Sequence, residues 1–208
     1  MTGSSPVGGS NILLLSVVYN KSMILTRPFP NTEIIVIKEF ASEEENSIIY
    51  EYLYSMYLAQ KEKDDSLKRL DLVDKSFETI NRLEKRYTEF AKENLFFVVE
   101  PSFTTLKNYV YWEAGKEMAP HYDNFHVEHA FPVMYGCIYY INDNFNGGEL
   151  HYPGLGVSYK PVARDMLIHP GTKEYSHGVR AVDEGVRITA SSFITKKDMS
   201  DERFTFEG

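Results

Sequence analysis

The sequence predicts a mainly β fold of the α+β class, in which helices come first and a double-sheeted antiparallel core, a sandwich or jelly roll, follows. From residue 95 onward about eight short β-rich runs, separated by Gly, Pro and Asn, follow one another without a helical pattern between them. Before that point, two stretches have helical periodicity. Aromatic residues make up 14% of the chain, which also favours sheet-rich packing.

A length of 208 residues is sufficient for one domain with a substantial core. Residues 1–10 are small and polar, so we expect them to be disordered or vector-derived. We expect residues 11–208 to form a single domain. Within it, 11–94 hold N-terminal strands and supporting helices, 95–197 form the β core that carries the chemistry, and 198–208 are a tail.

The helical part of the chain begins after two β-rich runs at 12–19 and 33–38. Ser42 and Glu45 form a capping box that predicts a helix to about residue 60. A second helix is predicted over 66–92, with an apolar stripe of Leu67, Leu70, Val73, Phe77, Ile80, Leu83, Tyr87 and Phe90. For a chain of this size, packing on the outside of one sheet is favoured over a coiled coil. The F-N-G-G-E segment at 145–149 predicts a hairpin connection.

The charge and cysteine content restrict the function and the location. A formal net charge of -8 argues against a nucleic-acid-binding surface. The single cysteine, Cys137, excludes an internal disulfide and fits a reducing compartment, most simply as a small buried residue. The apolar run at 12–19 is too short to span a bilayer and lacks the basic residues of a signal peptide. We therefore expect a cytoplasmic protein that does not contact a membrane.

The strongest chemical signal is the H-Y-D-N segment at 121–124. On a strand, His121 and Asp123 point to one side and Tyr122 to the other. An imidazole and a carboxylate so placed supply two of the three ligands of a 2-His-1-carboxylate site for non-haem Fe(II).

The third ligand has several candidates. His126 and His129 lie in an apparent loop, and His151 and His169 lie in predicted strands where an ordinary half-buried histidine is expected. His177 is favoured because it is followed by Arg187, in a strand where Arg187 and Thr189 share one face. An arginine in an apolar interior requires an anionic partner, and its fork of donors suits a carboxylate. A metal triad with such an anchor describes a 2-oxoglutarate site.

Residues 103–196 resemble the Fe(II)/2-oxoglutarate-dependent dioxygenases, and within them the prolyl 4-hydroxylase branch. The matching pieces occur in family order: H-Y-D-N at 121–124, C-I-Y-Y-I-N at 137–142, G-G-E-L-H-Y-P at 147–153, P-V-A-R-D-M-L-I-H at 161–169, and His177 with Arg187. The resemblance implies a double-stranded β-helix core.

The resemblance also implies roles for individual residues. His121, Asp123 and His177 would bind iron, and Arg187 would pair with the C5 carboxylate of 2-oxoglutarate. Tyr140 would place its hydroxyl on the same carboxylate, and Thr189 would be a further contact. A tyrosine is expected in the strand before H-x-D, where Tyr109, Tyr111 and Trp112 compete and Tyr111 is favoured. The chain departs from the family at two positions. Arg187 stands where many members have lysine, and Asp165 is assigned to the position of the glycine in the family's P-x-x-G-x-x-x-x-F strand.

The activity implied is hydroxylation of peptidyl proline, coupled to decarboxylation of 2-oxoglutarate to succinate and CO2. The implied cofactors are Fe(II), 2-oxoglutarate and O2, with ascorbate as an additional reductant. A peptide or protein substrate is expected, with residues 125–132 as part of its groove. Alternatives are hydroxylation of a free amino acid or small metabolite, nucleic-acid demethylation, which the acidic charge disfavours, and a non-catalytic β-sandwich binding module.

Overall fold

The structure is a computed structural model that describes residues 18–19, 23–63, 73–95, 101–103, 106–124 and 133–196. Several expectations lie outside these residues. They concern segment 1–10, the start of the second helix at 66–72, the proposed groove at 125–132 with His126 and His129, and the tail at 198–208. The division of 11–208 into a supporting part and a core stays a prediction.

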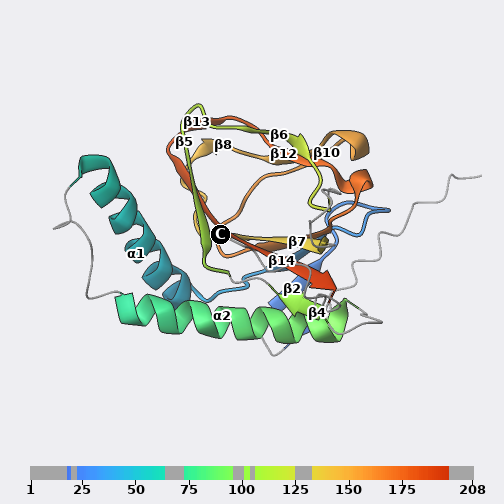
Figure 1. Ribbon diagram of the computed structural model, residues 1–208, viewed down its shortest axis with the longest axis horizontal. Coiled ribbons are helices and arrows are strands. Elements are labelled where there is room, and N and C mark those ends of the chain that lie inside the picture. Colours follow the sequence, from blue (N-terminus) through green and yellow to red (C-terminus); the bar gives the residue numbers. More distant parts are fainter. Residues whose placement is uncertain are drawn as a thin grey trace, which may run out of the picture.

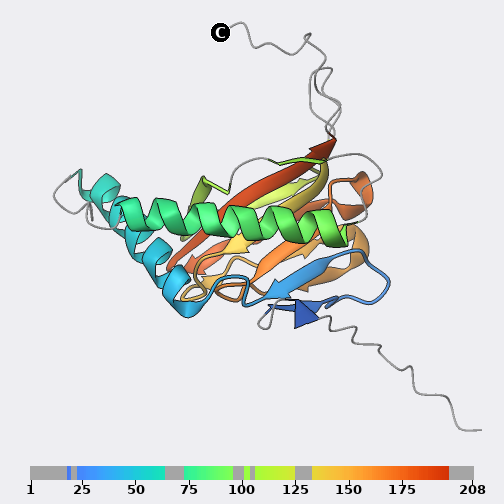
Figure 2. The same ribbon diagram turned by 90° about the horizontal axis from the view of Figure 1, so that it is seen from below.

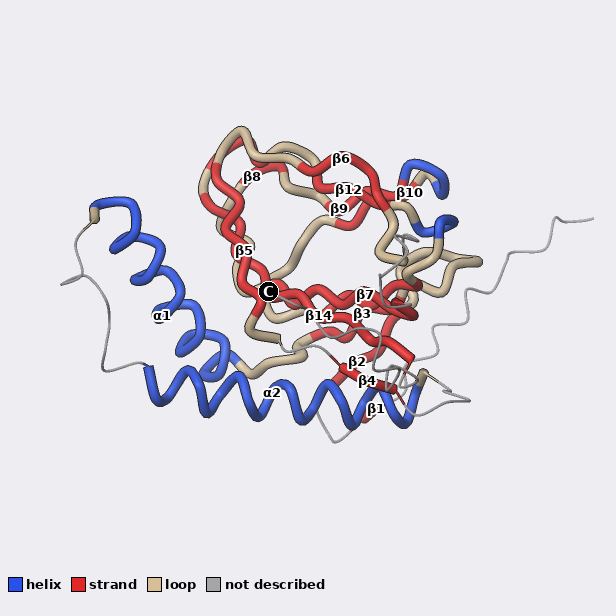
Figure 3. Tube along the Cα trace, in the orientation of Figure 1, coloured by secondary structure: helices blue, strands red, loops and turns tan. Residues whose placement is uncertain are grey.

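Two antiparallel sheets face each other and form a jelly roll (Figure 1, Figure 3). The larger sheet has the order β1 (Val18–Tyr19), β2 (Met23–Thr26), β3 (Ile35–Lys38), β11 (Met166–Pro170), β7 (Val133–Tyr140), β14 (Val186–Lys196) and β4 (Pro101–Phe103), with β5 (Asn108–Glu113) also paired to β14. The predicted mainly β fold with a jelly-roll core is confirmed.

The smaller sheet carries the segment that the sequence singles out. Its order is β10 (Val157–Tyr159), β9 (Leu150–Tyr152), β12 (His177–Val179) and β6 (Met118–His121). Short 3-10 turns, η3 (Pro153–Leu155) and η4 (Lys173–Tyr175), lie between its strands in the chain. A separate pair joins β8 (Asn146–Gly147) to β13 (Val182–Glu184). The segment 145–149 is therefore not a simple hairpin: β8 pairs with a strand from much later in the chain.

Two helices, α1 (Glu43–Glu62) and α2 (Val73–Asn94), cover the outer face of the larger sheet (Figure 1, Figure 2). The predicted capping box of α1 is present: the Glu45 N–H donates to Oγ of Ser42, and the Ser42 N–H donates to the Glu45 carboxylate. Packing of α2 on the sheet is also confirmed, because its buried residues join the same core cluster as β7 and β11. In the described part of the chain, no helix is long and apolar enough to cross a membrane.

The apolar stripe of α2 differs from the prediction at one position. Ile80, Leu83, Tyr87 and Phe90 are buried as expected, but Phe77 is 47% exposed. Its ring instead lies 5.7 Å from the Lys107 ammonium group, in a cation–π contact. The buried residues in this part of α2 are Ser76, Thr79 and Ile80, so the face that packs inward there does not include Phe77.

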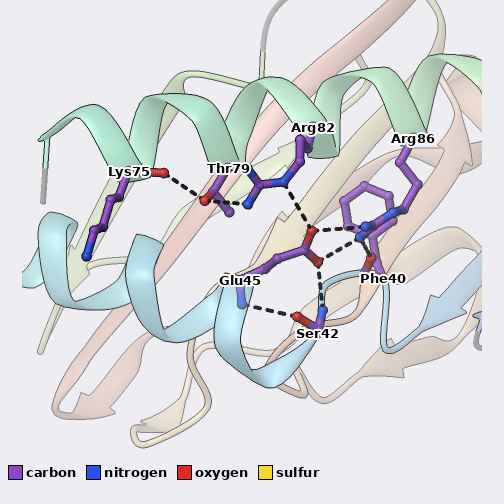
Figure 4. A network of polar contacts seen from close by, with 7 residues as sticks. All are labelled: Phe40, Ser42, Glu45, Lys75, Thr79, Arg82 and Arg86. Carbon is purple, nitrogen blue, oxygen red and sulfur yellow. Dashed lines mark hydrogen bonds and ion pairs between the residues drawn. The ribbon is translucent and has the colours of Figure 1, made fainter.

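A polar network ties the two helices together (Figure 4). Arg86 of α2 donates from both terminal nitrogens to the Glu45 carboxylate of α1, at 2.9 and 3.0 Å, and also to the Phe40 carbonyl oxygen. Burial raises the pKa of Glu45, but the hydrogen bonds from Arg86 and from the Ser42 N–H outweigh burial and lower it. The network fixes α1 against α2 beneath the larger sheet.

The core has two layers, which follow the alternation of side chains along each strand. On β11, Met166 and Ile168 pack toward the helices, whereas Leu167 packs into the space between the sheets. The same alternation on β7 sends Tyr139 toward the helices and Tyr140 inward. The inward layer is the one from which a site inside the jelly roll is built.

One sequence assignment near β11 needs correction. The residue in left-handed backbone geometry is Arg164, with φ 73°, and it occupies the fourth position of P-V-A-R, where the family motif has glycine. Asp165, read in its place, is buried and accepts hydrogen bonds from Lys38 and Tyr159. Such geometry is easiest for glycine, which explains the motif, but an arginine is accommodated here.

Candidate metal and co-substrate site

Three predicted ligands converge at the end of the smaller sheet. His121 ends β6 and His177 begins β12, and the two residues pair directly in the sheet. Asp123 follows β6, and its Oδ1 lies 3.8 Å from Nε2 of each histidine. One ligand atom from each of the three residues lies within 4.8 Å of the other two. The structure thus brings together the two imidazoles and one carboxylate that a facial Fe(II) site uses.

Both histidines are oriented by their own backbone surroundings. Nδ1 of His121 donates to the Ala119 carbonyl oxygen at 3.2 Å, and Nδ1 of His177 donates to the Tyr175 carbonyl oxygen at 3.1 Å. Because a carbonyl only accepts, each Nδ1 carries the proton and each Nε2 presents a lone pair. Histidine ligands of metals are held in this way.

The electrostatics of the triad suit a cation. Asp123 is largely buried, and burial raises the pKa of its carboxyl to about 6, with the nearby His121 opposing this. Burial lowers the pKa of His177 to about 4, so its ring is neutral near pH 7. Oδ2 of Asp123 has no hydrogen-bond partner among the described residues. A divalent ion would compensate a buried carboxylate that the protein leaves unpaired.

A cavity of about 170 Å³ extends from the triad into the space between the sheets. It is comparable in size to a cavity of about 150 Å³ that takes up benzene. Its apolar walls include Trp112, Ile138, Leu150 and Val179, and its polar lining includes Arg187 and Thr189. The cavity is therefore of a size for one small molecule.

Arg187 supplies a guanidinium to the lining of this cavity. Its side chain is only 1% exposed, and burial lowers the pKa of its guanidinium. The guanidinium carbon lies 5.4 Å from the Trp112 ring centre and 5.3 Å from that of Tyr140. The part of the chain that the structure describes offers Arg187 no acidic partner within salt-bridge distance. Its Nε, the Tyr140 hydroxyl and the Trp112 Nε1 are buried without a hydrogen-bond partner there. These donors fit an anionic ligand.

The other sequence-predicted residues divide into two groups. Thr189 is buried and lines the cavity, and Tyr140 contacts Arg187 from the inward face of β7. Tyr111 does not reach the cavity. Its hydroxyl donates to the Leu53 carbonyl oxygen and its ring stacks on Tyr57 of α1, so the choice of Tyr111 is corrected. The neighbour with the opposite orientation, Trp112, faces the cavity instead.

The sequence indicates His169 only as an alternative third ligand or an ordinary half-buried histidine, and does not predict its contact with Asp123. His169 ends the P-V-A-R-D-M-L-I-H segment, is 1% exposed, and places Nε2 3.7 Å from Oδ2 of Asp123. Burial, followed by the neighbouring His177 and His121, holds the pKa of His169 well below its usual range. The available signal was alternation, since Leu167 and His169 share the inward face of β11. His151 points the other way, between the inward Leu150 and Tyr152.

Comparison with known proteins agrees with the geometry. Residues 105–195 match the model of the 2OG-Fe(II) oxygenase superfamily. No curated protein matches the chain. Among solved structures, a viral collagen prolyl hydroxylase from Paramecium Bursaria Chlorella virus-1 is similar with a TM-score of 0.60 and 18% identity, over 80% of this chain and 97% of that one.

Two further solved structures share the fold. A Pseudomonas putida prolyl-4-hydroxylase has a TM-score of 0.54 and 14% identity, over 80% of this chain and 94% of its own. A Trichoplax adhaerens prolyl hydroxylase in complex with a hypoxia inducible factor peptide has a TM-score of 0.55 and 14% identity, over 80% and 84%. The predicted resemblance to the 2OG-Fe(II) oxygenases is borne out over residues 105–195, and the three prolyl hydroxylases share the fold of this chain.

Proposed function

Because residues 105–195 carry the pattern of the 2OG-Fe(II) oxygenase superfamily, we propose that this protein is an Fe(II)- and 2-oxoglutarate-dependent dioxygenase that hydroxylates peptidyl proline. The observation that carries the proposal is one cavity with two complementary ends. His121, Asp123 and His177 lie at one end, and Arg187, without an acidic partner in the described part of the chain, lines the same space.

The metal ligands would be Nε2 of His121, Nε2 of His177 and Oδ1 of Asp123. Bound Fe(II) would supply O2 activation and C–H hydroxylation, coupled to decarboxylation of 2-oxoglutarate to succinate and CO2. The protein itself fixes the ligands. The Ala119 and Tyr175 carbonyl oxygens hold the two imidazoles with Nε2 inward, and the carboxylate remains buried between them.

The co-substrate would lie in the cavity with its far carboxylate on Arg187. In that position the carboxylate would pair with the guanidinium and accept from the Tyr140 hydroxyl, and Thr189 lies on the same wall. Trp112, Ile138 and other apolar side chains exclude water, which strengthens the ion pair. An ion pair of this kind repays the burial of Arg187, which is otherwise costly.

A peptidyl proline is proposed as the substrate because the similar solved structures are prolyl hydroxylases, one of them bound to a peptide. The His121 side chain is 37% exposed, whereas those of Asp123 and His177 are 7% and 4% exposed. A substrate would therefore approach the metal from the His121 side. A free amino acid or small metabolite is the alternative substrate on the same scaffold.

Succinate formation tests the proposal. The protein would be incubated with Fe(II), 2-oxoglutarate and Pro-rich peptides, with and without ascorbate, and the peptides analysed by mass spectrometry. We expect succinate, and an increase in peptide mass by one oxygen atom located on proline. Matched peptides with alanine at the proline positions should gain no oxygen. Succinate without peptide oxidation would favour a small-molecule substrate, and no succinate at all would favour a non-catalytic binding module.

A further inference from the structure

His169 lies deep in the jelly roll, directly behind the proposed metal site. Its ring packs edge-on against His177, with ring centres 4.2 Å apart, and against Tyr152, with ring centres 5.6 Å apart. The residue is 1% exposed, so its polar ring is removed from solvent. A buried imidazole requires a polar partner, and the nearest carboxylate oxygen is Oδ2 of Asp123, 3.7 Å from Nε2.

The two oxygens of Asp123 have different surroundings. Oδ1 faces the Nε2 atoms of His121 and His177, at 3.8 Å from each. Oδ2 faces His169 and is buried without a hydrogen-bond partner among the described residues. The carboxylate is thus turned so that one oxygen is directed at the proposed metal and the other is directed away from it.

Gly136 on β7 provides the space in which Oδ2 and His169 meet. A Cβ atom at this position would overlap Oδ2 of Asp123 and would lie 2.8 Å from Nε2 of His169. Any side chain other than hydrogen would therefore separate the two groups. The absence of a side chain here allows the carboxylate and the imidazole to approach each other.

On the basis of the proposed metal site, we propose that His169 is a positioning residue for Asp123. Its Nε2–H donates to Oδ2, so that Asp123 ligates the metal through Oδ1 alone. The 3.7 Å separation is longer than a hydrogen bond of 2.7–3.2 Å, and a movement of less than about 1 Å would close it. A carboxylate that ligated through both oxygens would occupy a position that the co-substrate and O2 need.

A direct ligand role for His169 is less consistent with the geometry. The set of ligand atoms within 4.8 Å of one another comprises His121, Asp123 and His177, and His169 does not belong to it. Its Nε2 faces Oδ2, the carboxylate oxygen on the side away from the other two imidazoles. The structure therefore favours a role behind the carboxylate.

The first test measures Mn(II) affinity by titration calorimetry in the full chain, which does not depend on turnover. His169→Phe keeps a flat ring of similar size but removes the donor, and we expect it to weaken Mn(II) binding about 10–100-fold, as loss of a partner behind a metal ligand does. His169→Gln, which retains an N–H donor, should recover most of that loss. His151→Phe is the matched control, because this histidine is on β9 and faces away from the cavity. The Mn(II) affinity of His151→Phe should equal that of the wild type.

The second test needs no variant and so does not depend on the folding of a substituted protein. In the Zn(II)-loaded wild type, ¹⁵N-detected histidine spectra report which ring nitrogen carries the proton. The proposal requires the Nε2–H form of His169, with that proton protected from exchange. An Nδ1–H form, or direct binding of Zn(II) to Nε2 of His169, would overturn it.

The outcomes separate this inference from the proposed function. If the wild type binds Mn(II) and Asp123→Ala abolishes that binding, equal affinity in folded His169→Phe overturns only the role of His169. If the wild type does not bind Mn(II), or if Asp123→Ala binds it as well as the wild type, both proposals fail.

Discussion

His177 pairs directly with His121 across the β6–β12 ladder, which places the two imidazole centres 4.6 Å apart. Residues from distant parts of the sequence are thereby fixed by backbone pairing in the sheet. Asp123 follows β6 directly, which places its carboxylate near both histidines. The relative positions of the three groups therefore depend on the sheet, which makes substitutions of the individual side chains informative.

Asp123→Asn should have opposite effects on the protein with and without metal. Without metal, it replaces a buried carboxylate that has no hydrogen-bond partner on Oδ2 by a neutral amide, so the melting temperature should rise or stay equal. With metal, it removes the anionic ligand, and Mn(II) affinity should fall by more than about 100-fold, since even changes behind a ligand cost 10–100-fold. Thermal unfolding with and without Mn(II) measures both effects.

Tyr122→Phe is the control for that experiment, because Tyr122 lies between the two ligands in the chain but does not line the cavity. It should retain the stabilisation by Mn(II). Equal stabilisation of Asp123→Asn and the wild type by Mn(II) would contradict the assignment of Asp123 as a ligand.

Arg187→Met should weaken the binding of 2-oxoglutarate. The substitution removes the buried cation proposed to pair with the co-substrate carboxylate. A charged hydrogen bond contributes about 1.5–3 kcal/mol, which corresponds to roughly 10–100-fold in affinity. Without 2-oxoglutarate, the variant should be at least as stable as the wild type, because an uncompensated buried charge is replaced by an apolar side chain.

Arg187→Lys provides the graded comparison, because lysine keeps the charge but loses the fork of donors. We expect it to bind 2-oxoglutarate more weakly than the wild type and more tightly than Arg187→Met. Calorimetric titration of the Mn(II)-loaded proteins gives the order of the three affinities. Wild-type affinity in Arg187→Met would show that the co-substrate carboxylate lies elsewhere.

Tyr111 and Trp112 distinguish the two faces of β5. Tyr111→Phe should leave 2-oxoglutarate affinity unchanged and should lower the free energy of unfolding by about 1 kcal/mol, because it removes the hydrogen bond to the Leu53 carbonyl oxygen. Trp112→Leu should weaken 2-oxoglutarate binding, because the indole lines the cavity and faces the Arg187 guanidinium. The reverse pattern, measured by calorimetry and urea unfolding, would restore Tyr111 as the co-substrate contact.

The strands around the site show which side-chain orientations the sequence predicts and which it does not. H-x-D predicts that His121 and Asp123 lie close together, and they do, although β6 ends at His121 and Asp123 lies just beyond the strand. On β7, alternation correctly sends Tyr140 inward. In Y-V-Y-W, however, alternation gives two consistent registers, and only the pairing of Trp112 with Arg187 selects the one in which Trp112 faces the cavity. A sequence pattern cannot choose between registers when aromatic residues occupy both faces.

His169 and Phe77 show the same limit in other elements. His169 follows apolar residues on β11, and its contact with Asp123 depends on a neighbouring strand having glycine at position 136. Phe77 continues a helical stripe, but it is 47% exposed and its ring contacts Lys107. Both outcomes depend on tertiary contacts, which periodicity within one element does not contain.

Glu45→Gln should destabilise the protein in a pH-dependent manner. Glutamine retains the capping box with Ser42 but loses the charge that binds Arg86, and we expect a loss of about 1–3 kcal/mol at neutral pH. The pKa of Glu45 in the folded state is below its ordinary value of 4.5. The contribution is therefore complete above that pH and is lost as the pH falls through the lowered pKa.

Urea unfolding of the wild type and Glu45→Gln at several pH values between 3 and 7, in the range where the carboxyl titrates, measures that difference. Their free energies of unfolding should differ most at pH 7 and converge as the solution is acidified. Glu89→Gln is the matched control, because Glu89 of α2 is 58% exposed and contacts Lys85 only at 3.9 Å. It should change the stability by less than about 0.5 kcal/mol at every pH. A difference between Glu45→Gln and the wild type that stayed constant from pH 7 to pH 3 would mean that the Glu45 charge does not stabilise the contact between α1 and α2.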